Sequence, residues 1–447
     1  MLNALHNNKK LKYIAGAAAI LLLLIIFMLY NVSNNAAKVF NVLVSQQTIF
    51  KGKIVAEDLK CDLAGNITFN NLNWTTDNNE PIVKIPNGRI KFAIHDLLTM
   101  KVSPDTIKEI ELHNAALRLL FDNDMKLDVL RQDIPVQVPN EQPKAEVPAQ
   151  PQQKKHHQRN LNLPDKLPNW KVIVVDCSVD AYHKDRRYLT EDVDFQVDIS
   201  KHELLKLKFS SGPLGGTMIG KGIEINGQTN LHSEETNMKI RINDIVPSSL
   251  GLGNLTNAVN IDGELTGKAS APVLTGKISF DILEVKPFVF TEVSGNFHCQ
   301  GGVVNVTNTK GRCYGGAIDA QGKYGLDSHR YKIDAVAHSV NISQMPNLDK
   351  LDGVADLKFI VLCDPKTKNT VISGDFSIGK GKVAGVPFKS ATGSLFSHNK
   401  DLFFKNVKLN TGLGKISSHA FSIENGKLHT KPHMPNEEVI IAELERI

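Results

Sequence analysis

Cysteine and aromatic residues are scarce in this chain of 447 residues, and the shortage of cysteine excludes several kinds of site. The five cysteines include no CxxC pair, which excludes a zinc ribbon and a thioredoxin-type redox site. Their density is far too low for a fold stapled by disulfides. Two interpretations stay open: buried free thiols, or a single bridge between Cys299 and Cys313.

Charge of one sign is also in short supply, because 52 Lys and Arg oppose 47 Asp and Glu and leave a net charge of +5. No concentrated basic stripe stands outside one linker, so we expect no nucleic-acid partner. The content of 41% hydrophobic and 22% charged residues is typical of globular domains. It excludes a mainly disordered chain and a polytopic membrane protein, and the length favours two or three domains.

Charged residues are absent between Lys12 and Lys38, and this window contains the longest apolar run of the chain. The run extends from Ile14 to Leu29, and a tyrosine flanks it on each side. Such a run approaches the ~20 residues that cross a bilayer, with aromatics at the interfaces. We therefore expect a transmembrane signal-anchor helix over 13–32, behind a basic tail at 1–12. Its anchoring residues include Ile14, Leu22, Ile26 and Leu29.

The basic residues around this run predict its orientation. Lys9, Lys10 and Lys12 precede it and only Lys38 follows closely, so the positive-inside rule places the N-terminus in the cytoplasm. A cleaved signal peptide is the alternative, with its best cleavage site at Asn35-Ala36-Ala37. Either interpretation exports the remainder of the chain.

The exported part has the pattern of a β protein. Apolar residues alternate with polar ones in many short runs, such as Phe195, Val197 and Ile199, and Gly, Asn and Asp separate the runs. This period of two predicts strands with one apolar and one polar face, in an extended antiparallel sheet, sandwich or barrel. Short helical turns are expected only at 96–100 and 107–112, with a loop or short helix at 244–255 and a crossover at 342–351.

A linker at 133–168 divides the exported part. It holds seven of the chain's 19 prolines and a basic cluster around His156 and His157, and it cannot bury enough apolar surface to fold. We expect β regions on both sides of it, at 36–132 and 169–432. A short acidic tail, helical in pattern, follows at 433–447.

Motifs for chemistry are few and incomplete. Gly215 to Gly222 has the spacing of a phosphate-binding loop, but Gly222 replaces the required Ser or Thr and strand patterns surround the motif. Neither a G-x-S-x-G elbow nor an H-E-x-x-H pair is present, and the histidines are scattered. We expect a non-enzyme with no catalytic residue, cofactor or metal. An exported enzyme such as a wall hydrolase would need a cleft with convergent carboxylates.

Several segments resemble the AsmA and TamB families. Phe50 to Trp74 is a strand, a small turn and a second strand directly after the apolar run, and Pro81 to Leu130 continues in the same order. Further on, Ile261 to Phe280 (IDGELTGKASAPVLTGKISF) is similar to their G-x-L-x-G…P-x-L-x-G-x-I repeat. The same style recurs in three later segments: Gly311 to Leu326, Met345 to Pro365 and Gly374 to Leu395.

The resemblance implies an inner-membrane protein with a single span and its bulk in the periplasm. It implies a long, curled antiparallel sheet whose apolar groove holds phospholipid or another acyl-chain lipid, in envelope and outer-membrane biogenesis. Outer-membrane assembly components are implied as further partners. The alternating apolar residues would line the groove, and these candidates are Phe195, Val197, Ile199, Leu207, Phe209, Ile240, Ile242, Ile278, Phe280, Ile282, Ile318, Leu357, Phe359, Val361, Phe376 and Ile378.

Two alternatives to the open groove remain at this point. The same residues suit the core of a closed β-sandwich, because a sandwich requires the same alternation. A scaffold or assembly factor, whose sheet edges pair with the strands of outer-membrane proteins, is the alternative function.

Overall fold

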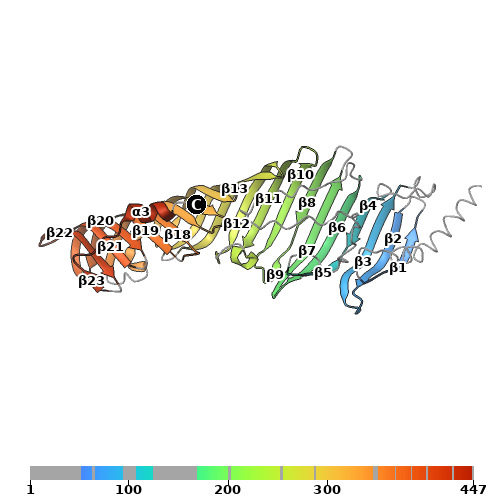
Figure 1. Cartoon of the computed structure of the whole chain (residues 1–447), viewed down its shortest axis with the longest axis horizontal. Helices are drawn as coiled ribbons and strands as arrows, with labels where there is room; N and C mark the ends of the chain where they lie inside the picture. Colours follow the sequence, from blue (N-terminus) through green and yellow to red (C-terminus); the bar gives the residue numbers. More distant parts are fainter. Residues whose placement is uncertain are drawn as a thin grey trace, which may run out of the picture. The chain divides into compact units, whose positions relative to one another are not determined.

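The chain is mainly β. The computed structural model describes residues 52–444 except 63–65, 94–106, 124–168, 200–202, 252–254, 286–287, 346–350, 368, 384, 399–400 and 425–426. Strands hold most of these residues, as the alternating pattern predicts (Figure 1). The expected anchor at 13–32, its residues Ile14, Leu22, Ile26 and Leu29, and the linker at 133–168 lie outside the described residues. Within the described part, no helix is both long and apolar enough to span a membrane.

The described residues form two compact units. Unit 1 contains the described residues within 52–217 together with 228–232, and unit 2 contains 218–227 and the described residues within 233–444. Strands β6–β9 therefore belong with β1–β5, although the expected linker at 133–168 separates them in sequence. β10 (Gly222–Asn230) contributes to both units.

Unit 1 contains nine complete strands, and most neighbours pair antiparallel. They are β1 (Lys53–Cys61), β2 (Asn66–Thr75), β3 (Pro81–Phe92), β4 (Ile107–His113), β5 (Ala116–Phe121), β6 (Lys171–His183), β7 (Arg186–Ile199), β8 (Leu204–Ser210) and β9 (Leu214–Gly216).

The pairing of β6 is an exception to the antiparallel order. β4 and β5 follow one another in line: both pair antiparallel with β3, and both pair parallel with β6. Parallel neighbours need a long crossover connection, and the 124–168 segment that joins β5 to β6 has the necessary length. The antiparallel arrangement that the sequence predicted therefore holds for the other strand pairs of unit 1, and β6 adds two parallel pairings to it.

Unit 2 is an antiparallel meander in which each strand from β11 to β22 pairs with the next along the chain. Its strands are β11 (Glu235–Ile245), β12 (Val259–Lys268), β13 (Ala271–Val285), β14 (Phe288–Gln300), β15 (Val303–Cys313), β16 (Gly316–Gly325), β17 (Tyr331–Asn341), β18 (Leu351–Asp364), β19 (Asn369–Val383), β20 (Val386–His398), β21 (Asp401–Thr411), β22 (Gly414–Glu424) and β23 (Lys427–His429).

Helices are few among the described residues, as the sequence predicts. Two are single 3-10 turns: η3 (Pro247–Leu250), in the expected 244–255 stretch, and η4 (Ile342–Gln344), at the start of the 342–351 crossover. The third is α3 (Glu437–Leu444), in the acidic tail. The prediction of a helical turn at 107–112 is wrong, because these residues form β4. Hydrogen bonds to two neighbouring strands, β3 and β6, outweigh the weak helical pattern there.

Bulges interrupt many strands at acidic or amide residues. Most of the non-glycine residues with positive φ inside strands are Asp or Asn, the side chains that tolerate the left-handed region best. A bulge bends its strand and increases the local twist, so repeated bulges curl a sheet. The bulged positions inside strands are Asp58, Asn71, Asp176, Asp192, Asp244, Glu292, Asn308, Ser339 and Asn406.

Three bulges share one hydrogen-bonding arrangement. The bulged residue's backbone N–H donates to a side-chain oxygen on the next strand, which replaces a hydrogen bond that the bulge removes from the ladder. The three pairs are Asp176 N–H to Asp194 Oδ1 at 2.9 Å, Asp244 N–H to Asn260 Oδ1 at 2.8 Å and Ser339 N–H to Asp356 Oδ1 at 3.0 Å.

We predict that Asp194→Ala loosens the bulge at Asp176, because the Asp176 N–H loses its acceptor. A net contribution of about 1 kcal/mol for this hydrogen bond predicts roughly fivefold faster hydrogen exchange at the Asp176 amide. Asp194→Asn keeps the Oδ1 acceptor and serves as the matched control. Equal exchange in the two variants would contradict this role for Asp194.

Candidate functional site

The candidate site is one face of the sheet, on which apolar side chains from successive strands line up. In unit 2 a cross-strand row of paired residues runs from β11 to β18, one residue per strand. Paired residues point to the same face, so the members form one strip. This row is Met238, Leu265, Leu274, Cys299, Val304, Tyr324, Tyr331 and Cys363.

A second row lies two residues further along each strand and therefore on the same face. Its members are Ile240, Gly263, Gly276, Phe297, Val306, Gly322, Ile333 and Val361. The glycines leave room for a large neighbour: a Cβ on Gly263 would stand 3.3 Å from the Phe297 ring. We call the face that carries these two rows the apolar face of unit 2.

At β14–β18 the apolar face of unit 2 is closed by its own side chains. Phe288 on β14 stacks on Phe359 on β18, with ring centroids 4.9 Å apart and planes 16° from parallel. β15, β16 and β17 separate these two strands in the meander, so the sheet must curl to bring the rings together. Phe290, Ile318 and Val361 are buried in the same cluster. This part of the face is a packed core.

At β11–β13 the same face is more open. Ile240, Leu265 and Leu274 belong to the two rows, and Ile242, Ile261 and Ile278 pair in a third row on the same face. All six are half-buried. Unit 2 therefore presents an apolar strip that is accessible at one end and filled at the other.

Unit 1 has an apolar face of the same construction. One row across β2, β3, β4, β6, β7 and β8 is entirely aliphatic: Ile67, Ile90, Ile110, Val172, Val197 and Leu207. The next row is Phe69, Gly88, Leu112, Val174, Phe195 and Phe209. The Phe69 ring occupies the space over Gly88, where a Cβ would approach its Cζ to 2.1 Å. Most members are half-buried.

The structure places the candidate groove residues in three groups. The buried ones are Ile199, Ile318, Phe359, Val361 and Ile378. The half-buried ones are Phe195, Val197, Leu207, Phe209, Ile240, Ile242, Ile278, Phe280, Leu357 and Phe376. Ile282 differs, because 50% of it is exposed while Phe280 and Leu283 both pack against the core. The irregularity at the facing Glu292, whose φ is positive, interrupts the alternation there.

Sequence reasoning missed the contribution of β2–β6 to the apolar face of unit 1. Ile67, Phe69, Ile110, Leu112 and Val174 belong to its rows but were not among the candidates. Their alternation was visible in the sequence, yet only the pairing of β4 with β6 places the early strands beside the later ones.

The opposite face carries charged side chains in both units. In unit 1, Arg89 on β3 contacts Glu109 at 2.9 Å and Glu111 at 2.5 Å on β4. Burial raises the pKa of Glu111, but hydrogen bonds from His113 and Arg89 outweigh it and hold that pKa below its usual value. In unit 2, the exposed Lys239 and Lys277 flank the half-buried Ile240 and Ile278. At these strands the sheet separates apolar from charged side chains.

α3 covers part of the other face of unit 2. Its Leu444 is buried against Leu362, Val371, Phe396 and Phe403 of β18–β21. Leu362 and Val361 are neighbours on one strand and point to opposite faces, so β18 is packed on both sides here.

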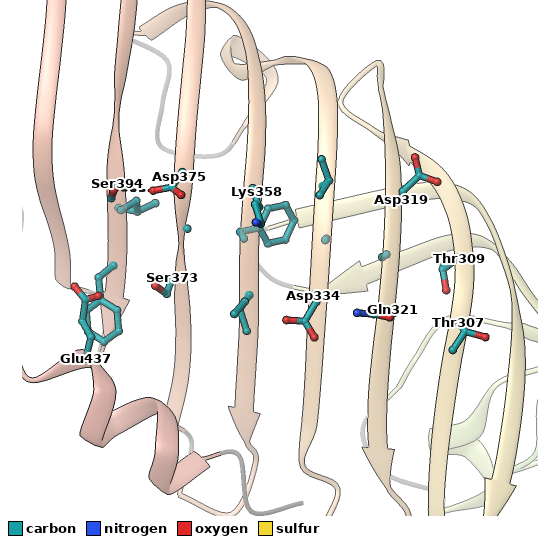
Figure 2. A pocket seen from close by; sticks show the side chains of 18 of the residues that line it. Thr307, Thr309, Asp319, Gln321, Asp334, Lys358, Ser373, Asp375, Ser394 and Glu437 are labelled. Carbon is teal, nitrogen blue, oxygen red and sulfur yellow. Dashed lines mark hydrogen bonds between the residues drawn. The ribbon is translucent and has the colours of Figure 1, made fainter.

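Beside α3 lies a hollow of about 980 Å³ with mostly polar side chains around it (Figure 2). Its polar groups are partly paired with one another: Lys405 Nζ lies 2.6 Å from Glu437 Oε1, and Ser394 Oγ donates to Asp375 Oδ1 at 2.7 Å. Across the described residues, no three His, Cys, Asp or Glu side chains gather to hold a metal ion. The hollow is on the face opposite the apolar rows.

Four cysteines of the described strands are free thiols. Cys299 and Cys313, the pair considered for a bridge, are both unpaired, as are Cys177 and Cys363. Cys299 faces Val304 and Cys313 faces Phe290, far apart along the β14–β15 pair. Burial raises the pKa of the Cys313 thiol to about 11.

We predict that the folded chain loses stability between pH 9 and 11 partly through Cys313. The unfolded thiol ionises near pH 9 and the folded one near pH 11, so in this window the unfolded state binds fewer protons and stability falls as pH rises. A difference of two pKa units is roughly 2 to 3 kcal/mol. Denaturant unfolding under reducing conditions should show this extra loss in the wild type and not in Cys313→Ala. Parallel pH curves would contradict it.

Comparison of the chain with models of known families, with curated proteins and with solved structures finds no match.

Proposed function

We propose that this protein binds acyl chains of phospholipid along its apolar faces and carries no catalytic activity. One observation supports this most strongly: rows of apolar residues continue strand by strand across the sheet and remain half-buried at β11–β13 and across unit 1. No second sheet faces these rows within the described residues. A bare apolar strip of this length is unfavourable in water, so an apolar ligand is a fitting cover.

The energetics favour an acyl chain. Removing each CH₂ group from water contributes ~0.8 kcal/mol, so a chain lying along several strands gains a substantial free energy of binding. The rows run across the strands, and neighbouring strands lie ~4.8 Å apart, so a strip of a few strands matches the length of one acyl chain. At β11–β13 the opposite face keeps exposed side chains such as Lys239 and Lys277 in water.

The packed core at β14–β18 restricts where this binding takes place. Phe359 and Val361 are buried against Phe288 and Phe290, so these positions serve the fold. The accessible positions are the half-buried ones, and we assign lipid contact to Ile240, Ile242 and Ile278 in unit 2. In unit 1 we assign it to Phe195, Val197, Leu207 and Phe209.

The cellular setting that we propose follows from the resemblance to the AsmA and TamB families and from the apolar run at 14–29. It is an inner-membrane anchor, with the sheet in the periplasm, acting in envelope and outer-membrane biogenesis.

A second function has one observation in its favour. β22 pairs along its length with β21, but β23 covers only Ser422 to Glu424 on the other side. Over Gly414–Phe421 no described strand occupies that side, which is the geometry for adding a strand of another protein by β-augmentation. A scaffold for outer-membrane proteins would use this edge and would need no lipid.

The test compares two double variants of the full chain, purified in mild detergent, by native mass spectrometry and lipid extraction. Ile240→Asn with Ile278→Asn changes the apolar face, and Lys239→Asn with Lys277→Asn changes the adjacent positions of the polar face. We expect roughly tenfold less bound phospholipid in the first variant and no change in the second, because only the first replaces two apolar side chains that contact the acyl chain.

Both variants keep the apolar run at 14–29, so lipid held by that run is equal in the two. Circular dichroism should show the same β content in both, because Ile240 and Ile278 are only half-buried. Equal lipid in the wild type and both variants would contradict lipid binding by this face and would favour the scaffold.

A further inference from the structure

Exposed apolar side chains of unit 2 gather at one rim of its sheet. The register places the β19–β20 turn, the β21–β22 turn and the start of β18 side by side, in the order Gly353, Gly381, Phe388, Thr411 and Gly414. Of the eleven large apolar residues that are exposed in the described part of the chain, five lie at this rim: Val354 (52% exposed), Val383 (39%), Val386 (57%), Leu413 (fully exposed) and Ile416 (60%).

The same rim is basic. Five exposed lysines lie at or near the same strand ends: Lys380, Lys382, Lys389, Lys408 and Lys415. Asp352, in register with Lys382, is the acidic residue nearest to them in the strand pairing. None of these lysines forms an ion pair with a described residue, so their charge is available to a partner.

The rim is anchored by a packed cluster beneath it. Ile378, Phe388 and Ala391 are buried together with Ile342 and Ala355 just inside the turns. The exposed valines and Leu413 are not part of this cluster. Their side chains are therefore not part of the buried core that stabilises the rim. A rim that presents exposed apolar side chains beside exposed lysines is suited to a surface that is anionic outside and apolar just below.

We propose that this rim, formed by the β19–β20 and β21–β22 turns, docks onto the surface of an anionic phospholipid bilayer. Val386 and Leu413 insert into the headgroup region, and the lysines bind lipid phosphates. This surface is separate from the apolar faces described above: it contacts a membrane from outside, whereas they hold single acyl chains. It therefore supplies a membrane contact that does not use the N-terminal apolar run.

The test uses the full chain held in phosphatidylcholine nanodiscs, so that the N-terminal apolar run is already satisfied. Binding to sedimentable vesicles of phosphatidylglycerol and phosphatidylcholine, at about one part to two, is measured against vesicles of phosphatidylcholine alone. The charge variant is Lys380→Gln with Lys382→Gln and Lys389→Gln. The tip variant is Val386→Asn with Leu413→Asn. The matched control removes the same charge elsewhere in unit 2, by Lys239→Gln, Lys277→Gln and Lys310→Gln.

We expect the wild type and the control to bind the anionic vesicles, with binding that weakens as salt rises. The charge and tip variants should each bind at least about tenfold more weakly, by the loss of headgroup attraction and of apolar insertion. The proposal would be overturned if the two rim variants bound the anionic vesicles as well as the wild type, or if the control variant lost binding to the same extent. It would also be overturned if the wild type did not bind these vesicles. Native mass spectrometry of the rim variants measures acyl-chain binding independently of vesicle docking. If these variants retain bound phospholipid, a failure of the docking proposal leaves the proposed acyl-chain binding intact.

Discussion

A single sheet with one apolar face must cover that face, because water does not tolerate a long apolar strip. Unit 2 covers apolar surface in two places. Between β14 and β18 the sheet curls until Phe288 stacks on Phe359, and the face becomes a packed core. On the opposite side, α3 covers Leu362 and the aromatic residues of β20 and β21. At β11–β13 and in unit 1, neither a stacked aromatic pair of this kind nor a covering helix is present among the described residues. We propose that acyl chains bind there.

The curl itself has a visible origin in the sequence. Asp and Asn occupy bulged positions in many strands, because their side chains tolerate positive φ and accept hydrogen bonds from neighbouring backbone groups. A bulge breaks the ladder locally, and the acceptors Asp194, Asn260 and Asp356 restore part of the lost hydrogen bonding. Polar residues inside apolar strands, which look like interruptions in the pattern, are therefore what allows the sheet to bend.

Much of the fold was predictable from alternation alone, and the errors have local causes. The β class, the scarcity of helices and the helix in the acidic tail followed from period and composition. The parallel pairing of β4 and β5 with β6 did not, since strand pairing across a long connection has no local signal. Burial was the other limit: Ile240 and Val361 have the same alternation and lie in one row, yet one is half-buried and the other fully buried. Only the curl distinguishes them.

The most direct test of acyl-chain binding is photo-crosslinking in cells that produce the protein. A benzophenone amino acid is placed at Ile278, on the apolar face, and in a second strain at Lys277, on the polar face of the same strand. We predict a phospholipid adduct, identified by mass, at position 278 and none at position 277. Adducts at both positions alike, or none at position 278 in a chain that folds normally, would contradict binding by this face.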